Sequence, residues 1–368
     1  MRIAYDYQIF AAQKYGGISR YFANLVNHLH VREQVRVFAP LHRNGYIKSM
    51  PAELVNGCGV EDFYPKTARL VNAYNKLVFS RKIKNWQPSI IHQTYYSSSN
   101  LHSNGYQTVV TVYDLIHELF SEQFHPRDKT VALKKKAVER ADHIICISEN
   151  TKVDLMRLYG IPEEKITVIY LGFDNLRDGV SEVMRANTAK PYLLYVGDRA
   201  GYKNFSTFLK AYASSRKLKQ DFDVVAFGGG KFSNAEIVMI NSLGLSSKQI
   251  HQFGGDDLAL GNFYANASAF IYPSKYEGFG IPPLEAMSLN CPVISSNTSS
   301  MPEVIGAAAQ YFDPTDVGDM VDAIESVLYS SVKGDTLKQL GREQLKKFSW
   351  EKCSIQTLAV YKSLVAEA

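Results

Sequence analysis

Two glutamates and the glycine-rich turn between them are the residues of this chain best suited to chemistry. Glu277 and Glu285 flank the segment GFGIPP at 278–283. Apolar runs at 267–271 and 292–294 predict buried strands on either side of a turn and a helix. Both prolines suit a first helical turn, where a missing N–H costs nothing. We expect Glu277 on the loop and Glu285 on the first turn of the helix. Free N–H groups and the positive end of the helix dipole would face an anion, and the carboxylates could bind sugar hydroxyls.

Two cations form a second group of residues that could take part in a reaction. Arg199 and Lys203 lie four residues apart in the segment YVGDRAGYKN at 195–204, after a predicted strand at 192–196. Arginine offers a bidentate fork and lysine a compact charge, so together they could clamp a diphosphate. They would also stabilise its charge as it leaves a reacting centre. With these cations in place, we expect the reaction to need neither a metal ion nor a cofactor.

Glycines follow three further predicted strands. Gly16 and Gly17 come after the first strand, and small residues there let the backbone approach a ligand closely. Ser19 is expected to cap the helix that follows at 19–30. In the second half of the chain, 228–230 and 252–255 also end strands. The first of these glycine turns could pass close to a ligand, and both could be plain turns.

Polar residues follow two more strands of the first half. Asp114 and His117 come just after a strand at 109–113, where they could orient a hydroxyl or a neighbouring cation. Whether His117 faces a ligand or lies at the edge of the core stays open. Ser148 follows a strand at 144–147 and suits the N-cap of a helix. It could contact a ligand as well.

The elements that position these residues repeat in two halves. Strand-like and helix-like segments alternate up to Gly172, and after a polar stretch at 174–190 the alternation begins again. Such alternation predicts two mainly parallel sheets, each covered by helices on both faces. Ligands of open parallel sheets bind beyond the carboxyl ends of the strands, where the candidate residues fall. A final amphipathic helix is expected from Phe348 onward.

The composition agrees with a two-domain globular chain. Its 368 residues exceed one ordinary hydrophobic core, and 46% of them are hydrophobic. Four scattered cysteines without metal-ligand spacing favour a reduced, cytoplasmic setting. The chain opens directly on a strand predicted over 2–10, which argues against a signal peptide. No apolar run approaches the roughly 20 residues that span a bilayer.

Positive charge is concentrated in the first half. Residues 1–175 hold 22 Lys and Arg against 16 Asp and Glu, which leaves the other 193 residues with 19 and 20. The segment 66–87 holds six cations and no acid, with apolar residues at roughly helical spacing. A basic amphipathic helix of this kind can lie on an anionic membrane surface. A solvated helix packed on its own domain is the alternative.

The motifs together resemble the retaining glycosyltransferases of the GT-B fold, in the large family-4 group. The resemblance is strongest in YEGFGIPPLEAM at 276–287 and extends to GGISRY at 16–21, VGDRAGYKN at 196–204 and ISENT at 147–151. It departs from the family at Tyr113-Asp114, where relatives often have His-Asp, which puts a catalytic role there in doubt.

This resemblance implies two facing Rossmann-like domains with a cleft between them. Residues 1–173 with 348–368 would form the acceptor side, and 174–347 would bind the nucleotide-sugar. By the same resemblance Glu277 contacts the donor sugar, Glu285 contacts the ribose, Phe253 lies at the base and Ser148 borders the cleft. The diphosphate would be held by Gly16, Gly17, Arg199, Lys203 and the amides of Gly278, Phe279, Gly280 and Ile281. Asp114 and His117 are candidates for catalysis because of their place after a strand.

The expected activity is transfer of a hexose from a nucleotide-sugar to a hydroxyl, with retention of configuration. The resemblance is closest to bacterial mannosyltransferase-like members that build surface polysaccharides such as lipopolysaccharide. GDP-mannose is therefore the first expected donor, and a UDP-sugar is the second. The acceptor would be a glycan or a polyprenyl-linked glycan, and no nucleic acid is expected to bind. The enzyme would be cytoplasmic, with its basic domain able to contact the inner face of the membrane.

Other classes of protein fit the sequence less well. A metal-dependent transferase needs Asp-x-Asp at the carboxyl end of a strand, whereas Asp221-Phe222-Asp223 precedes a strand. A dehydrogenase needs Gly-x-Gly-x-x-Gly, and the first strand–helix turn has only Gly16-Gly17. An epimerase of nucleotide-sugars on the same scaffold, and a non-catalytic protein that binds them, stay open as alternatives.

Overall fold

The computed structural model describes residues 1–97, 105–176, 180 and 188–367. Within them the chain divides into two compact units, Met1–Gly172 with Ser349–Ala368 (unit 1) and Phe173–Phe348 (unit 2). The expected domain limits differ from these by one residue. Much of the polar stretch expected as a linker at 174–190 lies outside the described residues. Among the residues described, no helix is both long and apolar enough to cross a membrane.

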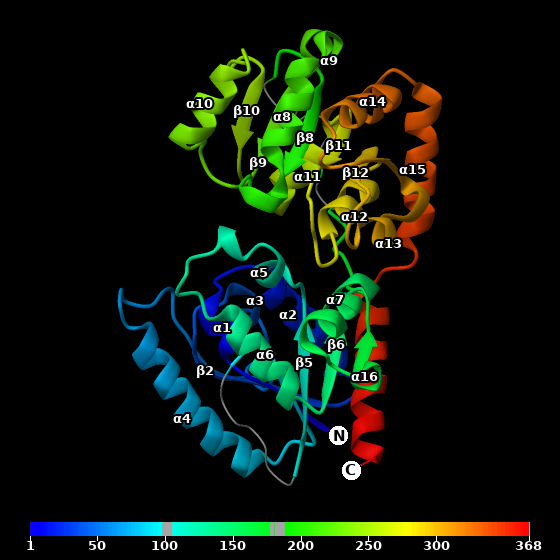
Figure 1. Cartoon of the computed structure of the whole chain (residues 1–368). Helices are drawn as coiled ribbons and strands as arrows, with labels where there is room; N and C mark the ends of the chain where they lie inside the picture. The colour runs from blue at the N-terminus through cyan, green and yellow to red at the C-terminus, as the bar shows by residue number, and fades with distance from the viewer. Residues whose placement is uncertain (98–104, 177–179, 181–187, 368) are drawn as a thin grey trace. The chain divides into compact units, whose positions relative to one another are not determined.

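Unit 1 is built on a parallel sheet with the strand order β3-β2-β1-β4-β5-β6-β7 (Figure 1). Ile3 of β1 pairs with Val35 of β2 on one side and with Ile90 of β4 on the other. The strand order therefore reverses between β1 and β4, which is where an open sheet usually binds its ligand. The strands are β1 Arg2–Tyr5, β2 Gln34–His42, β3 Val55–Gly59, β4 Ile90–Gln93, β5 Gln107–Val112, β6 His143–Cys146 and β7 Ile166–Val168.

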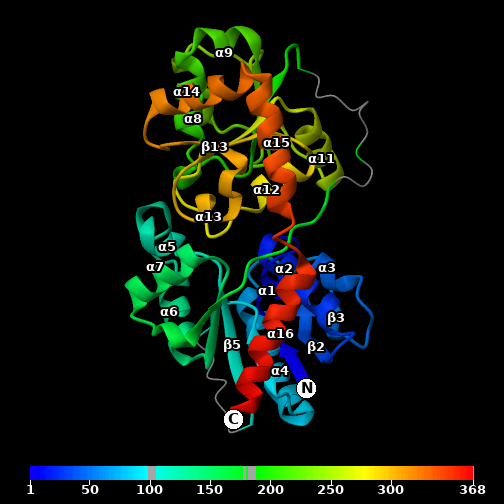
Figure 2. The same ribbon diagram turned by 90° about the vertical axis from the view of Figure 1, so that its right-hand side faces the viewer.

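The helices of unit 1 cover both sides of this sheet. In Figure 1 α16 lies on the side of the unit away from α4, and in Figure 2 it faces the viewer. The predicted C-terminal helix is thus present and begins at Trp350. The helices are α1 Gln8–Ala12, α2 Gly17–Leu29, α3 Gly45–Lys48, α4 Ala68–Trp86, α5 Ile116–Leu119, α6 Thr130–Arg140, α7 Glu149–Tyr159 and α16 Trp350–Ala366, with 3-10 turns at Ser121–Gln123 and Glu163–Lys165.

The first strand is shorter than predicted. We expected a strand over 2–10, but β1 ends at Tyr5 and α1 follows. The cause is Asp6, whose buried carboxylate accepts hydrogen bonds from the Gln8 amide and from Thr94. These bonds turn the chain into α1 and fasten it to the end of β4.

A buried polar network fastens α16 to the sheet. The hydroxyl oxygen of Tyr361 in α16 lies 3.2 Å from the Tyr5 hydroxyl oxygen and 2.5 Å from Nδ1 of His92. Nε2 of His92 lies 2.9 Å from the Thr111 hydroxyl. Burial lowers the pKa of His92 from 6.5 to about 3, so the ring is neutral at pH 7. The network ties three strands and the last helix into one unit.

We expect this histidine to make stability fall in mild acid. Between about pH 6.5 and 3 the unfolded chain binds a proton that the folded chain excludes, so the unfolding free energy decreases as the pH falls. The full slope is about 1.4 kcal/mol per pH unit for one such group. His42, whose pKa burial lowers to about 4, adds to it. Urea unfolding at pH 7, 6 and 5 should therefore show a shallower pH dependence for His92→Gln than for the wild type; equal slopes would contradict the assignment.

Unit 2 is a second parallel sheet, with the order β10-β9-β8-β11-β12-β13. Leu193 of β8 pairs with Val224 of β9 and with Ala269 of β11, so the order reverses between β8 and β11. Asp223 begins β9 at its amino end, as predicted from the position of the Asp-x-Asp triplet. The strands are β8 Tyr192–Val196, β9 Asp223–Phe227, β10 Ile250–Phe253, β11 Ala269–Tyr272, β12 Val293–Ser296 and β13 Ala309–Phe312.

Eight helices of the described part cover unit 2. Aromatic and aliphatic side chains of β8, β9, α8 and α14 fill its main core, among them Tyr195, Phe208 and Ile324. The helices are α8 Phe205–Ser214, α9 Arg216–Asp221, α10 Asn234–Ser242, α11 Asp257–Asn266, α12 Ile281–Ser288, α13 Met301–Ile305, α14 Val317–Leu328 and α15 Ser331–Leu345, with 3-10 turns at Gly201–Lys203 and Gly306–Ala308.

Candidate active site

The turn between β11 and α12 has the predicted strand–turn–helix form. Gly280 is the N-cap of α12 and has φ of 103°, in the left-handed region that favours glycine. The first helical residues are Ile281, Pro282 and Pro283, and because proline has no N–H the start of α12 offers fewer backbone donors than an ordinary helix. The turn lies at the carboxyl end of β11, beside the reversal of strand order. The predicted strand, glycine turn and helix are therefore present, and anion binding there stays a prediction.

Glu277 forms an ion pair with Lys203 across the point where the strand order reverses. Nζ of Lys203 lies 2.8 and 3.0 Å from the two carboxylate oxygens. Ser274 donates a third hydrogen bond, of 2.6 Å, to Oε1. Burial is the largest single influence and lowers the pKa of Lys203, but the charge and hydrogen bond of Glu277, together with Tyr202 and Asp198, raise the pKa above its ordinary value. Lys203 therefore remains cationic at neutral pH.

A serine-rich segment supports this turn from behind. Ser300 donates to the backbone oxygens of Glu277 and Phe279, at 2.8 and 2.9 Å. The Ser299 hydroxyl donates to the Glu277 oxygen at 2.6 Å and accepts from its amide at 3.3 Å. The backbone of Glu277 is thus fixed on both sides. Sequence analysis missed these serines because Ser and Asn runs are typical of any loop.

Glu285 lies deeper in α12 than predicted. Ile281 is the first helical residue, which makes Glu285 the fifth and places it in the second turn. Its side chain is buried, and the Tyr264 hydroxyl lies 3.4 Å from Oε2. The expectation of a first-turn position was wrong because the helix begins only after Gly280. Glu277 and Glu285 still belong to one strand–turn–helix unit.

Arg199 has a different role from the one expected. Its guanidinium donates to the backbone oxygens of Gly228, Gly229, Gly230 and Lys231, at 2.8 to 3.2 Å. Its Nε lies 2.6 Å from Glu236, and the side chain is only 4% exposed. Because these partners occupy the guanidinium, Arg199 does not offer it to a diphosphate. The structure assigns it to positioning the glycine turn after β9.

The glycine turn requires glycine for two reasons. Gly228, Gly229 and Gly230 have φ of 89°, 65° and 68°, all in the left-handed region. A Cβ on Gly229 would lie 2.6 Å from a guanidinium nitrogen of Arg199. Phe253 ends the neighbouring β10, where its ring contacts Phe263 with centroids 4.9 Å apart. The glycine turn and Phe253 thus lie at the same edge of the sheet.

In unit 1, Gly17 begins α2 and Gly16 is its N-cap. The predicted cap by Ser19 is wrong, because Ser19 is the third residue of the helix and its hydroxyl donates to the Gly16 oxygen. Gln13 caps instead, accepting from the Ser19 amide at 3.2 Å. A Cβ on Gly16 would lie 2.5 Å from the Gln13 oxygen. No local sequence signal points to a glutamine six residues upstream as the cap.

The other predicted residues of unit 1 differ in exposure. The Asp114 side chain is 31% exposed and lies 3.9 Å from the buried ammonium of Lys134, which matches the predicted neighbouring cation. His117 stacks on Phe124, and its Nδ1 is buried with no hydrogen-bond partner in the described structure. Ser148 is fully buried, and its hydroxyl caps α7 by accepting from the Thr151 amide. Capping therefore accounts for Ser148 and leaves no exposed surface for a ligand.

Comparison with protein families decides what kind of enzyme has these two units. Residues 15–176 match the family model described as "Glycosyltransferase Family 4", and residues 176–346 match the one described as "Glycosyl transferases group 1". The chain belongs to the GT-B glycosyltransferases. Sucrose-phosphate synthase from Thermosynechococcus elongatus shares this GT-B fold, with a TM-score of 0.75, 20% identity and coverage of 100% of this chain and 99% of that one.

Other relatives of this glycosyltransferase have named activities. It is 28% identical over 375 residues to "O-antigen chain mannosyltransferase B" of Escherichia coli, covering 95% of this chain and 96% of that one. It is 29% identical over 223 residues to "O-antigen chain mannosyltransferase RfbU" of Salmonella typhimurium, covering 59% and 60%. Anabaena HepE, solved in complex with UDP and glucose, has a TM-score of 0.71 at 18% identity, with coverage of 99% and 100%.

Proposed function

We propose that this glycosyltransferase is a retaining, metal-independent hexosyltransferase that uses GDP-mannose and a hydroxyl of a glycan or polyprenyl-linked acceptor. The observation that carries the proposal is the Lys203–Glu277 ion pair beside the start of α12. A cation, a carboxylate and the start of a helix meet at the strand-order reversal of unit 2. The names of the O-antigen mannosyltransferase relatives support mannose. A UDP-sugar remains the second candidate.

Each group has a distinct part in the proposed transfer. The diphosphate lies at the amides of Gly278 to Ile281, with Lys203 donating to it. Because its charge grows as the sugar departs, fixed donors there stabilise the transition state. Glu277 orients the sugar hydroxyls and supports the positive charge that develops on the ring, and Glu285 binds the ribose. Two charged groups and a helix terminus suffice for this chemistry without a metal.

The bond changes of the transfer balance without an outside reagent. The bond between the anomeric carbon and the β-phosphate oxygen breaks, and the acceptor oxygen bonds to that carbon on the same face. The acceptor proton passes to the departing phosphate. Gly16 and Gly17 at the start of α2, with Asp114 and His117, are proposed to serve the diphosphate and the acceptor from unit 1. An epimerase would need a further acid–base pair beside the sugar.

We expect GDP to raise the melting temperature more than UDP, ADP or dTDP do. A ligand at a hundred times its dissociation constant adds about 2.7 kcal/mol to the native state. For a domain of this size that is a shift of roughly 5–10 °C. The shift should be the same with and without a chelator. Differential scanning fluorimetry measures both effects.

The same measurement can contradict the proposal in two ways. A larger shift with UDP than with GDP would indicate that the donor is a UDP-sugar. A shift that the chelator abolishes would show that a divalent ion is part of the site. Turnover of GDP-mannose then separates the enzyme from a protein that only binds nucleotide-sugars.

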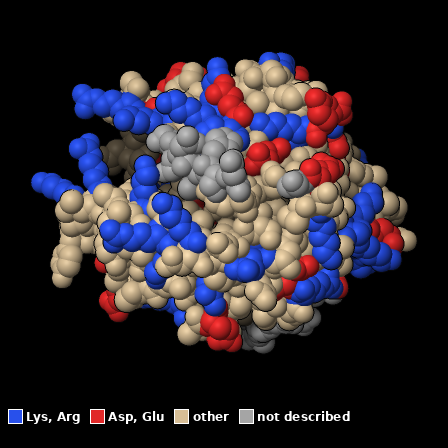
Figure 3. All heavy atoms as spheres, turned by 90° about the horizontal axis from the view of Figure 1, so that it is seen from below, with Lys and Arg blue, Asp and Glu red and all other residues tan. Residues whose placement is uncertain are grey.

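We also propose that α4 contacts an anionic membrane surface from the cytoplasmic side. This helix packs on its unit through Asn75, Phe79 and Ile83, as the solvated-helix alternative requires. It nevertheless exposes Leu70, Tyr74 and Leu77 among cations. Figure 3 shows Lys and Arg side chains gathered on the side of the molecule where α4 lies. Sedimentation with phosphatidylglycerol vesicles at low salt tests this contact, and the protein is expected in the pellet with the vesicles. Protein that stays in the supernatant would contradict the proposal.

A further inference from the structure

A cavity lies at the ligand-binding edge of unit 1, apart from the residues predicted to act in catalysis. Its volume is about 670 Å³. Tyr7 and Gln8 follow β1, Arg43 follows β2, and Tyr95 to Ser97 follow β4. The cavity therefore spans the reversal of strand order between β1 and β4. Open parallel sheets bind their ligands at such a position.

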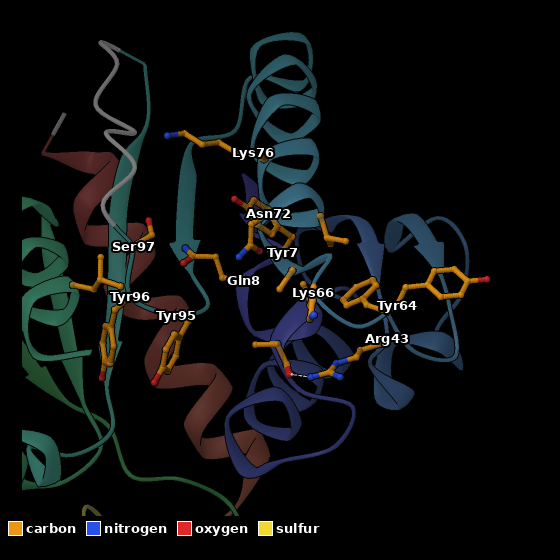
Figure 4. A pocket seen from close by; sticks show the side chains of 17 residues that line it. Tyr7, Gln8, Arg43, Tyr64, Lys66, Asn72, Lys76, Tyr95, Tyr96 and Ser97 are labelled. Carbon is orange, nitrogen blue, oxygen red and sulfur yellow. Dashed lines mark hydrogen bonds between the residues drawn. The ribbon is translucent and has the colours of Figure 1, made fainter. Parts of the chain in front are cut away.

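The charge of this cavity is entirely positive. Its 17 lining residues in the described part of the chain include Arg43, Lys66 and Lys76 and no Asp or Glu. Within the described residues, Lys66 and Lys76 form no ion pair or hydrogen bond through their side chains. Figure 4 shows Arg43 and Lys66 at one end of the labelled set and Lys76 on α4 at the other. Two of the three cations, Lys66 and Lys76, thus have no counterion in the described part of the chain, which points to an anionic ligand.

Arg43 is only partly engaged by the protein. It donates to the Ala12 oxygen at 2.5 Å and pairs with Asp62, whose side chain is 61% exposed. Such an exposed ion pair is weak and exchanges readily with another anion. The Nε of Arg43 is buried and has no hydrogen-bond partner in the described structure. A buried donor without a partner is rare, so a ligand oxygen would satisfy it.

Five aromatic residues form a large part of the remaining walls. Tyr7, Phe63, Tyr64, Tyr95 and Tyr96 all line the cavity. Behind them the buried Asp6 carboxylate lies 2.6 Å from Nε2 of Gln8 and 3.0 Å from the Thr94 amide, which joins the chain after β1 to the chain after β4. Aromatic rings suit the faces of sugar rings or a hydrocarbon chain. The cations suit a phosphate, which prefers Arg and Lys.

We propose that this cavity binds an acceptor that carries a phosphate ester, with the phosphate at the end that holds Arg43 and Lys66 and the attached sugar or hydrocarbon against the tyrosines, while Lys76 adds positive charge at the other end. The inference rests on the proposed function, because it names the chemical class of the acceptor. The phosphate can belong to a soluble sugar phosphate or to a lipid. Both sources share the same anion.

Binding of three probes tests the proposal. Inorganic diphosphate and a hexose 1-phosphate are titrated by calorimetry, and phosphatidylcholine vesicles with or without a polyprenyl phosphate are used in sedimentation. The wild type should bind at least one probe, and the double variant Lys66→Met, Lys76→Met should bind it at least tenfold more weakly. Lys135→Met, Lys136→Met is the matched control, because it removes two exposed lysines of α6 outside the cavity. It should bind as the wild type does.

The outcomes separate the acceptor site from the donor site. Preference for the hexose 1-phosphate identifies a soluble acceptor, and binding that requires the polyprenyl phosphate identifies a lipid. Absence of binding to all three probes would overturn the proposal, as would equal binding by the cavity variant and the control. The melting-temperature shift with GDP should be the same in all variants. Loss of that shift in the wild type would instead count against the proposed donor site.

Discussion

Glu277→Gln should lower turnover at least about a hundredfold, since losing one preorganised electrostatic contact to a transition state typically costs 10²–10³ in rate. The substitution keeps the side-chain size and can keep the 2.6 Å contact with Ser274, but it removes the charge that pairs with Lys203. The loss should appear in kcat and not only in KM, because the carboxylate supports charge that develops during transfer. Steady-state release of nucleoside diphosphate measures it.

Glu343→Gln is the matched control for this variant. Glu343 is an exposed glutamate of α15 in the same unit, paired only with Lys346 on the surface. The control should retain wild-type turnover and melting temperature. If Glu277→Gln also retains near-normal turnover while both proteins stay folded, Glu277 is not the residue that acts on the donor sugar.

Arg199→Met should destabilise unit 2 by about 2–4 kcal/mol, because it removes the buried partner of Glu236 and of four backbone oxygens. The glycine turn after β9 loses its central contact, so nucleotide affinity should fall together with stability. Chemical denaturation monitored by circular dichroism measures the change in unfolding free energy.

Lys203→Met provides the contrast, four residues away. Lys203 has one carboxylate partner and keeps 23% of its side chain exposed. Lys203→Met should therefore lower the free energy of unfolding less than Arg199→Met does. It should lower turnover more. Equal losses of stability in the two variants would contradict the separate roles that the structure gives them. Near-normal turnover in Lys203→Met would show that Lys203 does not stabilise the departing diphosphate.

Strand positions were largely predictable because parallel strands are buried on both faces and read as short apolar runs. The strand β3 was missed, since its sequence VNGCG has two glycines and no apolar run. It forms at the edge of the sheet, where Gly57 lies so close to Ala39 that a Cβ there would be 1.7 Å from its oxygen. Only the neighbouring strand shows why that position is a glycine.

Helix starts were less predictable than strands. The predicted cap of α7 by Ser148 is present, because a serine directly before a helix satisfies a backbone amide locally. The cap of α2 comes from Gln13, whose side chain returns from outside the helix. Local signals therefore identify a cap only when the capping residue is adjacent in sequence.

The sequence by itself determined the alternation of strands and helices and the strand–turn–helix around Glu277, because these depend on local spacing, and its motifs carried the resemblance to the family. Tertiary structure decided which charges are available. Arg199 and Lys203 read alike in sequence, yet one is occupied by the carbonyls of the turn after β9 and the other faces a single carboxylate. The cavity with Arg43, Lys66 and Lys76 likewise exists only when strands far apart in sequence meet at one edge. Hydrogen-bond partners and ion pairs depend on distances across a sheet, and spacing along the chain does not specify them.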